Sequence, residues 1–205
     1  MADRKHGAKA PATTRTVRAR DWTFEELDGE TFDKVLFLNV DMMELADRGA
    51  VFTDCTFRGV RFNASTHRGA AFTNCTFVNC SFFDAAFTDC KLVGSMFDRC
   101  SYGLMRVEGG DWGFTGLPGA DLGGTVLRRV RMREADLTGA RLVQAEVREC
   151  DLSGAWLHSA DFTDCDLRGT DLTGIDPDTV TLKRAVVDIP QAMVVAEALG
   201  LKVAP

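Results

Sequence analysis

The feature that most constrains this chain is an apolar position that recurs every five residues. The register runs from Trp22 to Val187 without a slip and contains 34 positions. All of them are apolar or aromatic except Asp47, His67 and Pro177. A period of five matches neither the 3.6 residues per turn of an α-helix nor the two-residue alternation of a strand. It therefore predicts a repeating structure whose backbone turns once per repeat.

A second column of small residues lies two positions before each of these centres, and it contains every cysteine of the chain. The seven cysteines are Cys55, Cys75, Cys80, Cys90, Cys100, Cys150 and Cys165. Their separations are multiples of five, whereas metal sites use spacings such as C-x2-C. We therefore expect free thiols that pack as small core hydrophobes, with no metal and no cofactor. An odd number of cysteines without a secretion signal favours a cytoplasmic protein.

The repeat is clearest between Ala135 and Gly174, which contain units such as ADLTG, DLSGA and DLRGT. At these residues the chain resembles the pentapeptide-repeat family, and the resemblance covers about residues 31–187. It implies an all-β fold, a right-handed quadrilateral β-helix with four repeats in each twenty-residue coil. We expect about eight coils over residues 21–187, followed by a short C-terminal α-helix within residues 188–205.

Sorting the centres by twenty residues gives four internal ladders, and the N-terminal half of these ladders is rich in phenylalanine. The predicted core ladder residues are Phe52, Phe57, Phe62, Phe72, Phe77, Phe82, Phe87 and Phe97. Phe83 falls outside the register, so we expect its side chain to point outward.

One ladder contains two polar residues, because Asp47 and His67 are twenty positions apart and would stack directly. Two interpretations remain open. The two side chains could form a buried carboxylate–imidazole pair, since either one alone would be costly inside the core. Alternatively, residues 43–49 could bulge, turning Asp47 outward and letting Leu45 fill the core. We favour the bulge, because coils near an end are less constrained.

The sequence offers no catalytic constellation. The segment Gly109–Gly119, GGDWGFTGLPG, lacks the Lys-Ser/Thr ending and the strand-to-helix context of a phosphate-binding loop. His6, His67 and His158 are scattered, and neither a Ser-His-Asp set nor a carboxylate pair converges. We therefore predict a protein that is not an enzyme and has no catalytic residues.

The two ends of the chain differ in character. Residues 1–20 contain six basic residues and one acidic residue and show no repeat, so we expect a basic disordered tail. Near the other end, Asp188 is a helix cap with Pro190 in the first turn, Gln191 completes a capping box, and Gly200 ends the helix. In the family such segments mediate a two-fold dimer, and a cap on a monomer is the alternative. The dimer-interface candidates are Pro190, Met193, Val194, Val195, Ala198, Leu199 and Leu201.

Three stretches are similar to the mycobacterial fluoroquinolone-resistance members of the family: Ser65–Phe77, Leu92–Cys100 and Ala185–Leu201. This similarity implies a protein that binds DNA gyrase, with topoisomerase IV as a second partner, by imitating DNA. It would inhibit the enzyme or protect it from fluoroquinolones and other gyrase poisons. The alternative is an interaction scaffold for a different protein partner, without catalysis.

The charge of the chain is compatible with this function. Residues 21–205 contain 29 acidic and 18 basic residues, so this part of the chain should repel nucleic acid itself. No apolar run is long enough to cross a membrane. The gyrase-facing candidates are Asp111, Asp121, Asp136, Asp151, Asp161, Asp164, Asp166 and Asp171. Aspartate at these positions also suits the turns of the repeat, and neighbouring arginines interrupt the negative surface.

Overall fold

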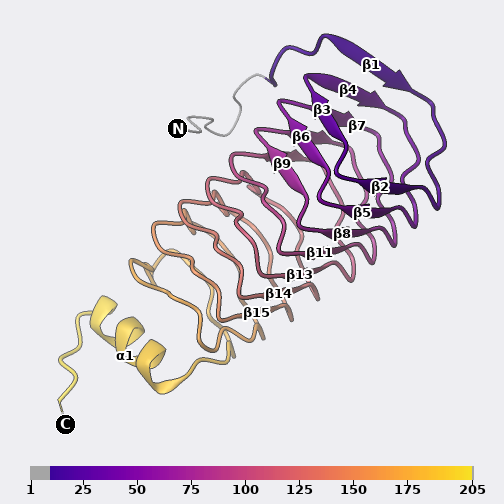
Figure 1. Cartoon of the computed structure of the whole chain (residues 1–205). Coiled ribbons are helices and arrows are strands. Elements are labelled where there is room, and N and C mark those ends of the chain that lie inside the picture. Colours follow the sequence, from indigo (N-terminus) through magenta and orange to yellow (C-terminus); the bar gives the residue numbers. More distant parts are fainter. Residues whose placement is uncertain (1–9, 205) are drawn as a thin grey trace.

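The computed structural model describes residues 10–204, which form a parallel β-solenoid closed at one end by a short helix. Each coil takes twenty residues and lies on the next, so the chain winds into a rod (Figure 1). Every strand pair is parallel, and its partners are twenty residues apart, as in Arg15↔Val35 and Val126↔Glu146. The predicted β-helix with a C-terminal helix is thus confirmed.

The coil has four faces, named here in chain order. The first face contains β1 (Arg15–Arg18), β4 (Val35–Leu38), β7 (Thr56–Arg58), β10 (Thr76–Val78) and β12 (Met96–Asp98). The second face is built from single parallel bridges such as Asp21↔Asp41 and Asp121↔Arg141. The third contains β2 (Glu26–Asp28), β5 (Ala46–Arg48), β8 (Thr66–Arg68), β11 (Ala86–Thr88), β13 (Arg106–Glu108), β14 (Val126–Arg128) and β15 (Glu146–Arg148). The fourth contains β3 (Thr31–Asp33), β6 (Val51–Thr53) and β9 (Ala71–Thr73).

The third face shows how regular the winding is. Its pairings run from Glu26 to Val186 in uninterrupted steps of twenty residues. Hydrogen bonds between coils satisfy the backbone, and turn bonds such as Ala140 N–H to Leu137 O close the corners. One coil is irregular around Pro177, where the N–H of Ser159 donates to Thr179 O. The register nevertheless recovers, since Phe162 N–H donates to Thr181 O at 2.8 Å.

The core is built from stacked rings. The eight phenylalanines expected in the ladders are all buried. Phe52 stacks on Phe72 with 4.7 Å between ring centroids, and Phe57 stacks on Phe77 at 4.8 Å. These distances match the strand spacing of a sheet, because each ring simply follows its own backbone up the rod. The small residues of the second column, cysteines included, fill the corners between the large centres.

The solenoid starts earlier than the sequence predicted. β1 (Arg15–Arg18) pairs with β4, and Thr14 N–H donates to Lys34 O at 2.8 Å. The expectation of a disordered tail over residues 1–20 is therefore wrong for residues 15–18, and residues 1–9 lie outside the described part of the chain. The physical reason is Val17, which continues the ladder above Phe37 while the arginines beside it stay in solvent.

The helix α1 (Ile189–Ala198) lies at the end of the rod opposite β1 (Figure 1). Asp188 accepts from Gln191 N–H, the Gln191 side chain accepts from Asp188 N–H, and Pro190 is in the first turn, as predicted. Gly200 follows the C-cap with φ +80°. The Gln191 amide also donates to Leu167 O and Thr170 O, which ties the helix to the coil beneath it. Among residues 10–204 no helix has the length and apolar character needed to cross a membrane.

Candidate functional site

The polar ladder position contains a buried hydrogen-bonded network. Asp47 lies in β5 between Leu27 and His67, and its side chain points into the core, with 1% of the residue exposed. Its Oδ2 lies 2.9 Å from His67 Nδ1, and its Oδ1 accepts from Ala50 N–H at 2.9 Å. The bulge expected at residues 43–49 does not occur. Leu45 is already buried at its own corner position, so no bulge is required to bring its side chain into the core.

The network continues to Ser65, which gives it the order of a Ser-His-Asp triad. His67 Nε2 lies 3.0 Å from Ser65 Oγ. However, the Ser65 hydroxyl donates to Phe62 O at 2.7 Å, and the residue is 0% exposed. A nucleophile must reach a substrate, and this one is enclosed by the core. The geometry therefore fits a structural role.

The cysteines lie in the corners as free thiols, and six of the seven are buried. Burial raises the pKa of Cys90 and of Cys165 to about 12, and that of Cys150 to about 11. Raised values keep these thiols protonated and unreactive at neutral pH. The described residues contain no group of three His, Cys, Asp or Glu side chains that could hold a metal ion.

The eight acidic candidates do not share one face of the rod. Asp111, Asp151 and Asp171 lie in one ladder on the fourth face, where Arg131 separates Asp111 from Asp151. Asp121 and Asp161 lie on the second face, with Asp164 at its corner. Asp136 lies on the first face and Asp166 on the third. A partner that approaches one side of the rod would therefore meet only some of these carboxylates.

Most of these aspartates serve the turns of their own repeats. In seven of the eight, all but Asp164, the Oδ1 accepts from the backbone N–H two residues later, at 2.9–3.2 Å. The side chain thus mimics a backbone turn, which explains its recurrence before the centre. At Asp161 the hydrogen bond from Thr163 lowers the pKa of the carboxyl, so it stays ionised.

Arginines neutralise five of the eight candidates. The partners are Arg131 for Asp111, Arg141 for Asp121, Arg133 for Asp151, Arg184 for Asp164 and Arg168 for Asp166, at 2.5–3.4 Å. The hydrogen bonds from Arg184 lower the pKa of Asp164, and those from Arg168 lower the pKa of Asp166. In the described part of the chain, Asp136, Asp161 and Asp171 form no ion pair.

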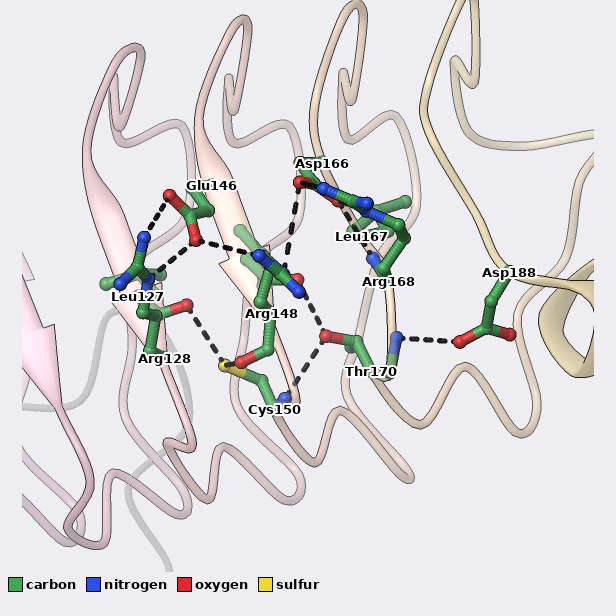
Figure 2. Close-up of polar contacts among 12 residues, drawn as sticks. Leu127, Arg128, Glu146, Arg148, Cys150, Asp166, Leu167, Arg168, Thr170 and Asp188 are labelled. Atoms are coloured by element: carbon green, nitrogen blue, oxygen red, sulfur yellow. Dashed lines mark hydrogen bonds and ion pairs between the residues drawn. The ribbon is translucent and has the colours of Figure 1, made fainter.

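On the third face the ion pairs join into one ladder, which Figure 2 shows across three coils. Arg128 donates to Glu146 at 2.6 and 2.8 Å, and Arg168 donates to Asp166 at 2.9 and 2.7 Å. Arg148 lies between the two carboxylates, 3.9 Å from each. Cations and anions therefore alternate from Arg128 to Arg168, and this part of the face offers little net charge to a partner.

The first coils carry a negative surface that the sequence analysis missed. Residues 21–44 contain eight acidic residues and a single basic one, Lys34. Six of these acidic side chains are exposed and form no ion pair among residues 10–204. We name these six the N-terminal acidic group: Asp21, Glu25, Glu26, Asp28, Glu30 and Glu44. Counting charges over successive segments of the sequence would have revealed this group. Considering only the aspartate that precedes each repeat centre does not, because most of these residues occupy other positions of the repeat.

The C-terminal segment presents an apolar outer surface. Among the predicted interface residues, Pro190, Met193, Ala198, Leu199 and Leu201 are exposed. Val194 and Val195 instead pack partly buried against the core. Ile189 and Val203 were not predicted, and they are 79% and 44% exposed. The outer face of α1 is thus an unpaired apolar surface at the end of the rod.

Two further features complete the surface. Phe83 is 52% exposed and lies against Gly103 of the next coil, so it points outward as expected. The segment Gly109–Gly119 keeps the repeat register, with Trp112 and Leu117 buried. At its first corner lies a hollow of about 700 Å³ whose lining mixes both charges, including Lys91, Arg129 and Glu149.

Comparisons with known proteins agree with the geometry. Residues 117–154 and 135–174 match a family model described as pentapeptide repeats, and residues 50–127 match a pentapeptide repeat region. No curated protein sequence matches the chain significantly. Two trypsin-treated forms of QnrB1, a plasmid-mediated fluoroquinolone resistance protein, have similar structures. The first has a TM-score of 0.55 and 21% sequence identity, and the match covers 95% of this chain and 100% of the trypsin-treated chain. The second has a TM-score of 0.54 and 20% sequence identity, and the match covers 94% of this chain and 98% of that chain.

Proposed function

The chain belongs to the pentapeptide-repeat family, and on that premise we propose that it is a DNA-mimicking protein that binds DNA gyrase. Binding would inhibit the enzyme, or protect it from fluoroquinolones and other gyrase poisons, without catalysis by this chain. The observation that carries the proposal is a straight rod whose surface repeats carboxylates at the spacing of its coils. The likeness in fold to QnrB1, described as a fluoroquinolone resistance protein, directs the choice of partner.

The rod carries a net negative charge, as such a mimic requires. Because the solenoid begins at Arg15, the rod spans residues 15–187, which contain 20 basic and 27 acidic residues, a net charge of −7. Coils about 4.8 Å apart make these residues roughly 41 Å long, so the rod has about one net negative charge per 6 Å. Double-stranded DNA carries one per about 1.7 Å. The mean charge density of the rod is therefore less than a third of that of DNA, so the positions of individual carboxylates matter more than the total charge.

Carboxylates without an ion pair are the best candidates for contact with gyrase, because they bring their full charge to a partner. We propose two groups of them as contacts. One is Asp136, Asp161 and Asp171 in the C-terminal half, and the other is the N-terminal acidic group. The candidates that form ion pairs are weaker contacts: Asp111, Asp121, Asp151, Asp164 and Asp166. We propose that topoisomerase IV, if it binds, uses the same surfaces.

The apolar face of α1 supports a homodimer in which two rods join through their helices. Exposed Met193, Leu199 and Leu201 would then be buried between the two copies, which removes apolar surface from water. The dimer would be a rod of about twice the single length, with an N-terminal acidic group at each end.

A supercoiling assay with purified gyrase, with and without a fluoroquinolone, tests the function. Two charge reversals separate the surfaces: Asp161→Lys with Asp171→Lys, and Glu25→Lys with Glu26→Lys. We expect salt-sensitive binding that at least one reversal weakens tenfold or more. The matched control exchanges a pair outside both groups, Asp84→Arg with Arg106→Asp, which keeps both the net charge and the local ion pair. The control should bind as the unchanged chain does.

The second candidate is a scaffold for a different protein partner. It is favoured by exposed aromatic side chains, since Phe24 is 68%, Phe83 52% and Trp156 54% exposed. Aromatic residues supply much of the binding energy at protein interfaces. If the chain neither binds gyrase nor inhibits nor protects it, the gyrase proposal is wrong and the scaffold remains.

A further inference from the structure

In the N-terminal half, apolar packing does little to define which residue of one coil lies on which residue of the next. The ladders there place phenylalanine on phenylalanine, as in Phe37 on Phe57 and Phe62 on Phe82. If one coil held fifteen or twenty-five residues, a shift of five would still stack Phe57 on Phe72 and Phe62 on Phe77. A five-residue loop at a corner adds little entropy cost of its own. Apolar packing alone therefore discriminates weakly between the native coil and a slipped one.

The polar ladder position is different, because the bond between Asp47 and His67 forms only in the native register. We propose that the buried Asp47–His67–Ser65 network is a register lock, which fixes the twenty-residue pitch of the solenoid while its coils assemble. Asp47 and His67 meet only when β5 lies directly on β8. After a slip of five residues Asp47 would face Phe62 or Phe72, and His67 would face Phe52 or Met42.

The network is complete in its hydrogen bonds, which makes the penalty for a slip large. Because the Ser65 hydroxyl donates to Phe62 O, His67 Nε2 donates to Ser65 Oγ, and Nδ1 donates to Asp47 Oδ2. The second carboxylate oxygen accepts from Ala50 N–H. Both ring nitrogens of His67 thus have a polar partner, and its ring stacks on Phe87 with 4.7 Å between centroids.

A slipped coil would break the one bond of the network that crosses between coils, so Asp47 Oδ2 and His67 Nδ1 would be buried without a partner while the bonds within each coil remain. Leaving a buried charge unpaired is far more costly than replacing the whole pair by apolar residues. A single polar group in an apolar core is known to fix register in this way, at some cost in stability. The network therefore discriminates between registers more strongly than any phenylalanine pair of the same ladders.

The experiment compares refolding of the full chain with that of Asp47→Leu/His67→Phe, which turns the polar ladder into an apolar one. Each protein is unfolded in urea and refolded by dilution, and its amide NMR spectrum and hydrogen exchange are recorded. We expect the double variant to resist urea as well as the unchanged chain. Its yield of the native species should nevertheless fall at least threefold, with a second set of amide signals and bimodal exchange.

The matched control is Phe52→Leu/Phe72→Leu, a pair twenty residues apart in the neighbouring ladder. It loses ring packing but keeps the network, so it should be less stable and still refold to one species. The proposal is overturned if the Asp47→Leu/His67→Phe chain refolds to a single native species in normal yield. It is equally overturned if that chain does not fold at all while the control does, because the network would then supply stability and not register.

Discussion

Each repeat of the solenoid places one residue in the left-handed region of φ/ψ space, two positions after the centre. This holds for every fifth residue from Ala19 to Gly174. Glycine is common there, but Phe24, Leu104 and Phe114 adopt the same conformation with φ of 57–61°. A side chain at this corner points away from the core, so the cost is local strain of about 1–2 kcal/mol. The frequent glycine of the repeat is thus a preference and not a requirement.

Gly110 is the exception, because it lies at a second left-handed position directly after Gly109. Its φ is +91°, and a Cβ added there would lie 2.1 Å from the backbone oxygen of Cys90. Gly110→Ala should therefore destabilise the chain by about 2 kcal/mol or more, since backbone of two coils must move apart. Urea unfolding measures the difference in free energy.

Gly124→Ala is the control for this prediction. Gly124 has a similar left-handed φ of +66°, but an added Cβ there meets nothing within 4 Å. Its cost should stay near the 1–2 kcal/mol of the left-handed conformation itself. Equal losses in the two variants would show that the close approach to Cys90 is unimportant.

A single strand of three residues is a weak element, so the faces are stabilised by interactions between side chains of successive coils. On the third face this includes the ladder of Arg128, Glu146, Arg148, Asp166 and Arg168 (Figure 2). The hydrogen bonds from Arg128 lower the pKa of Glu146, and those from Arg168 lower the pKa of Asp166. A lowered pKa in the folded state means that the ionised form stabilises the fold.

The sign of the resulting pH dependence follows directly. The stabilisation is fully present above the unfolded-state pKa values of about 4, and it is lost as the pH falls through the lower folded values. Glu146→Gln/Asp166→Asn should cost about 1 kcal/mol at neutral pH, because such exposed pairs contribute little. Once the pH has fallen below these lowered folded-state pKa values, the two proteins should converge in urea unfolding. A gap that stays constant with pH would contradict this role.

The elements differ in how far the sequence could predict them. The helix α1 could be predicted to the residue, because Asp188, Pro190 and Gln191 act through local hydrogen bonds that their spacing defines. The start of the solenoid could not be predicted in this way. Val17 is a single apolar centre among charged neighbours, and it joins the core only because it packs on Phe37 of the next coil. The Asp47–His67 pair also depends on contact between coils, so local constraints wrongly favoured a bulge.

The whole molecule is asymmetric between its two ends. The coils of β2 and β3, which carry most of the N-terminal acidic group, lie near one end, and α1 with its apolar face lies at the other. Figure 1 shows the positions of these elements. The acidic positions of the repeat could be predicted from sequence, but their distribution over four faces and their arginine partners could not. These depend on which side chains the twenty-residue pitch brings together, which a linear count of charge does not resolve.

The homodimer gives a prediction for the whole molecule. The chain should sediment as a dimer of twice its 22.4 kDa mass. Met193→Glu with Leu199→Glu should weaken association at least a hundredfold, about 3 kcal/mol, because two charges would be buried in an apolar interface. Leu104→Glu is the control, since Leu104 is equally exposed at 54% but lies far from α1 along the chain. A monomeric unchanged chain would refute the interface.

The uniform pitch makes the length of this protein adjustable in discrete increments. Removing or duplicating one twenty-residue block would leave every remaining coil in contact with an equivalent neighbour, and would change the rod by about 4.8 Å. In a dimer joined through α1, the same block would move the two acidic tips by roughly twice that amount. Evolution could therefore change the distance between the two acidic ends in steps of one coil, without altering the packing of the core.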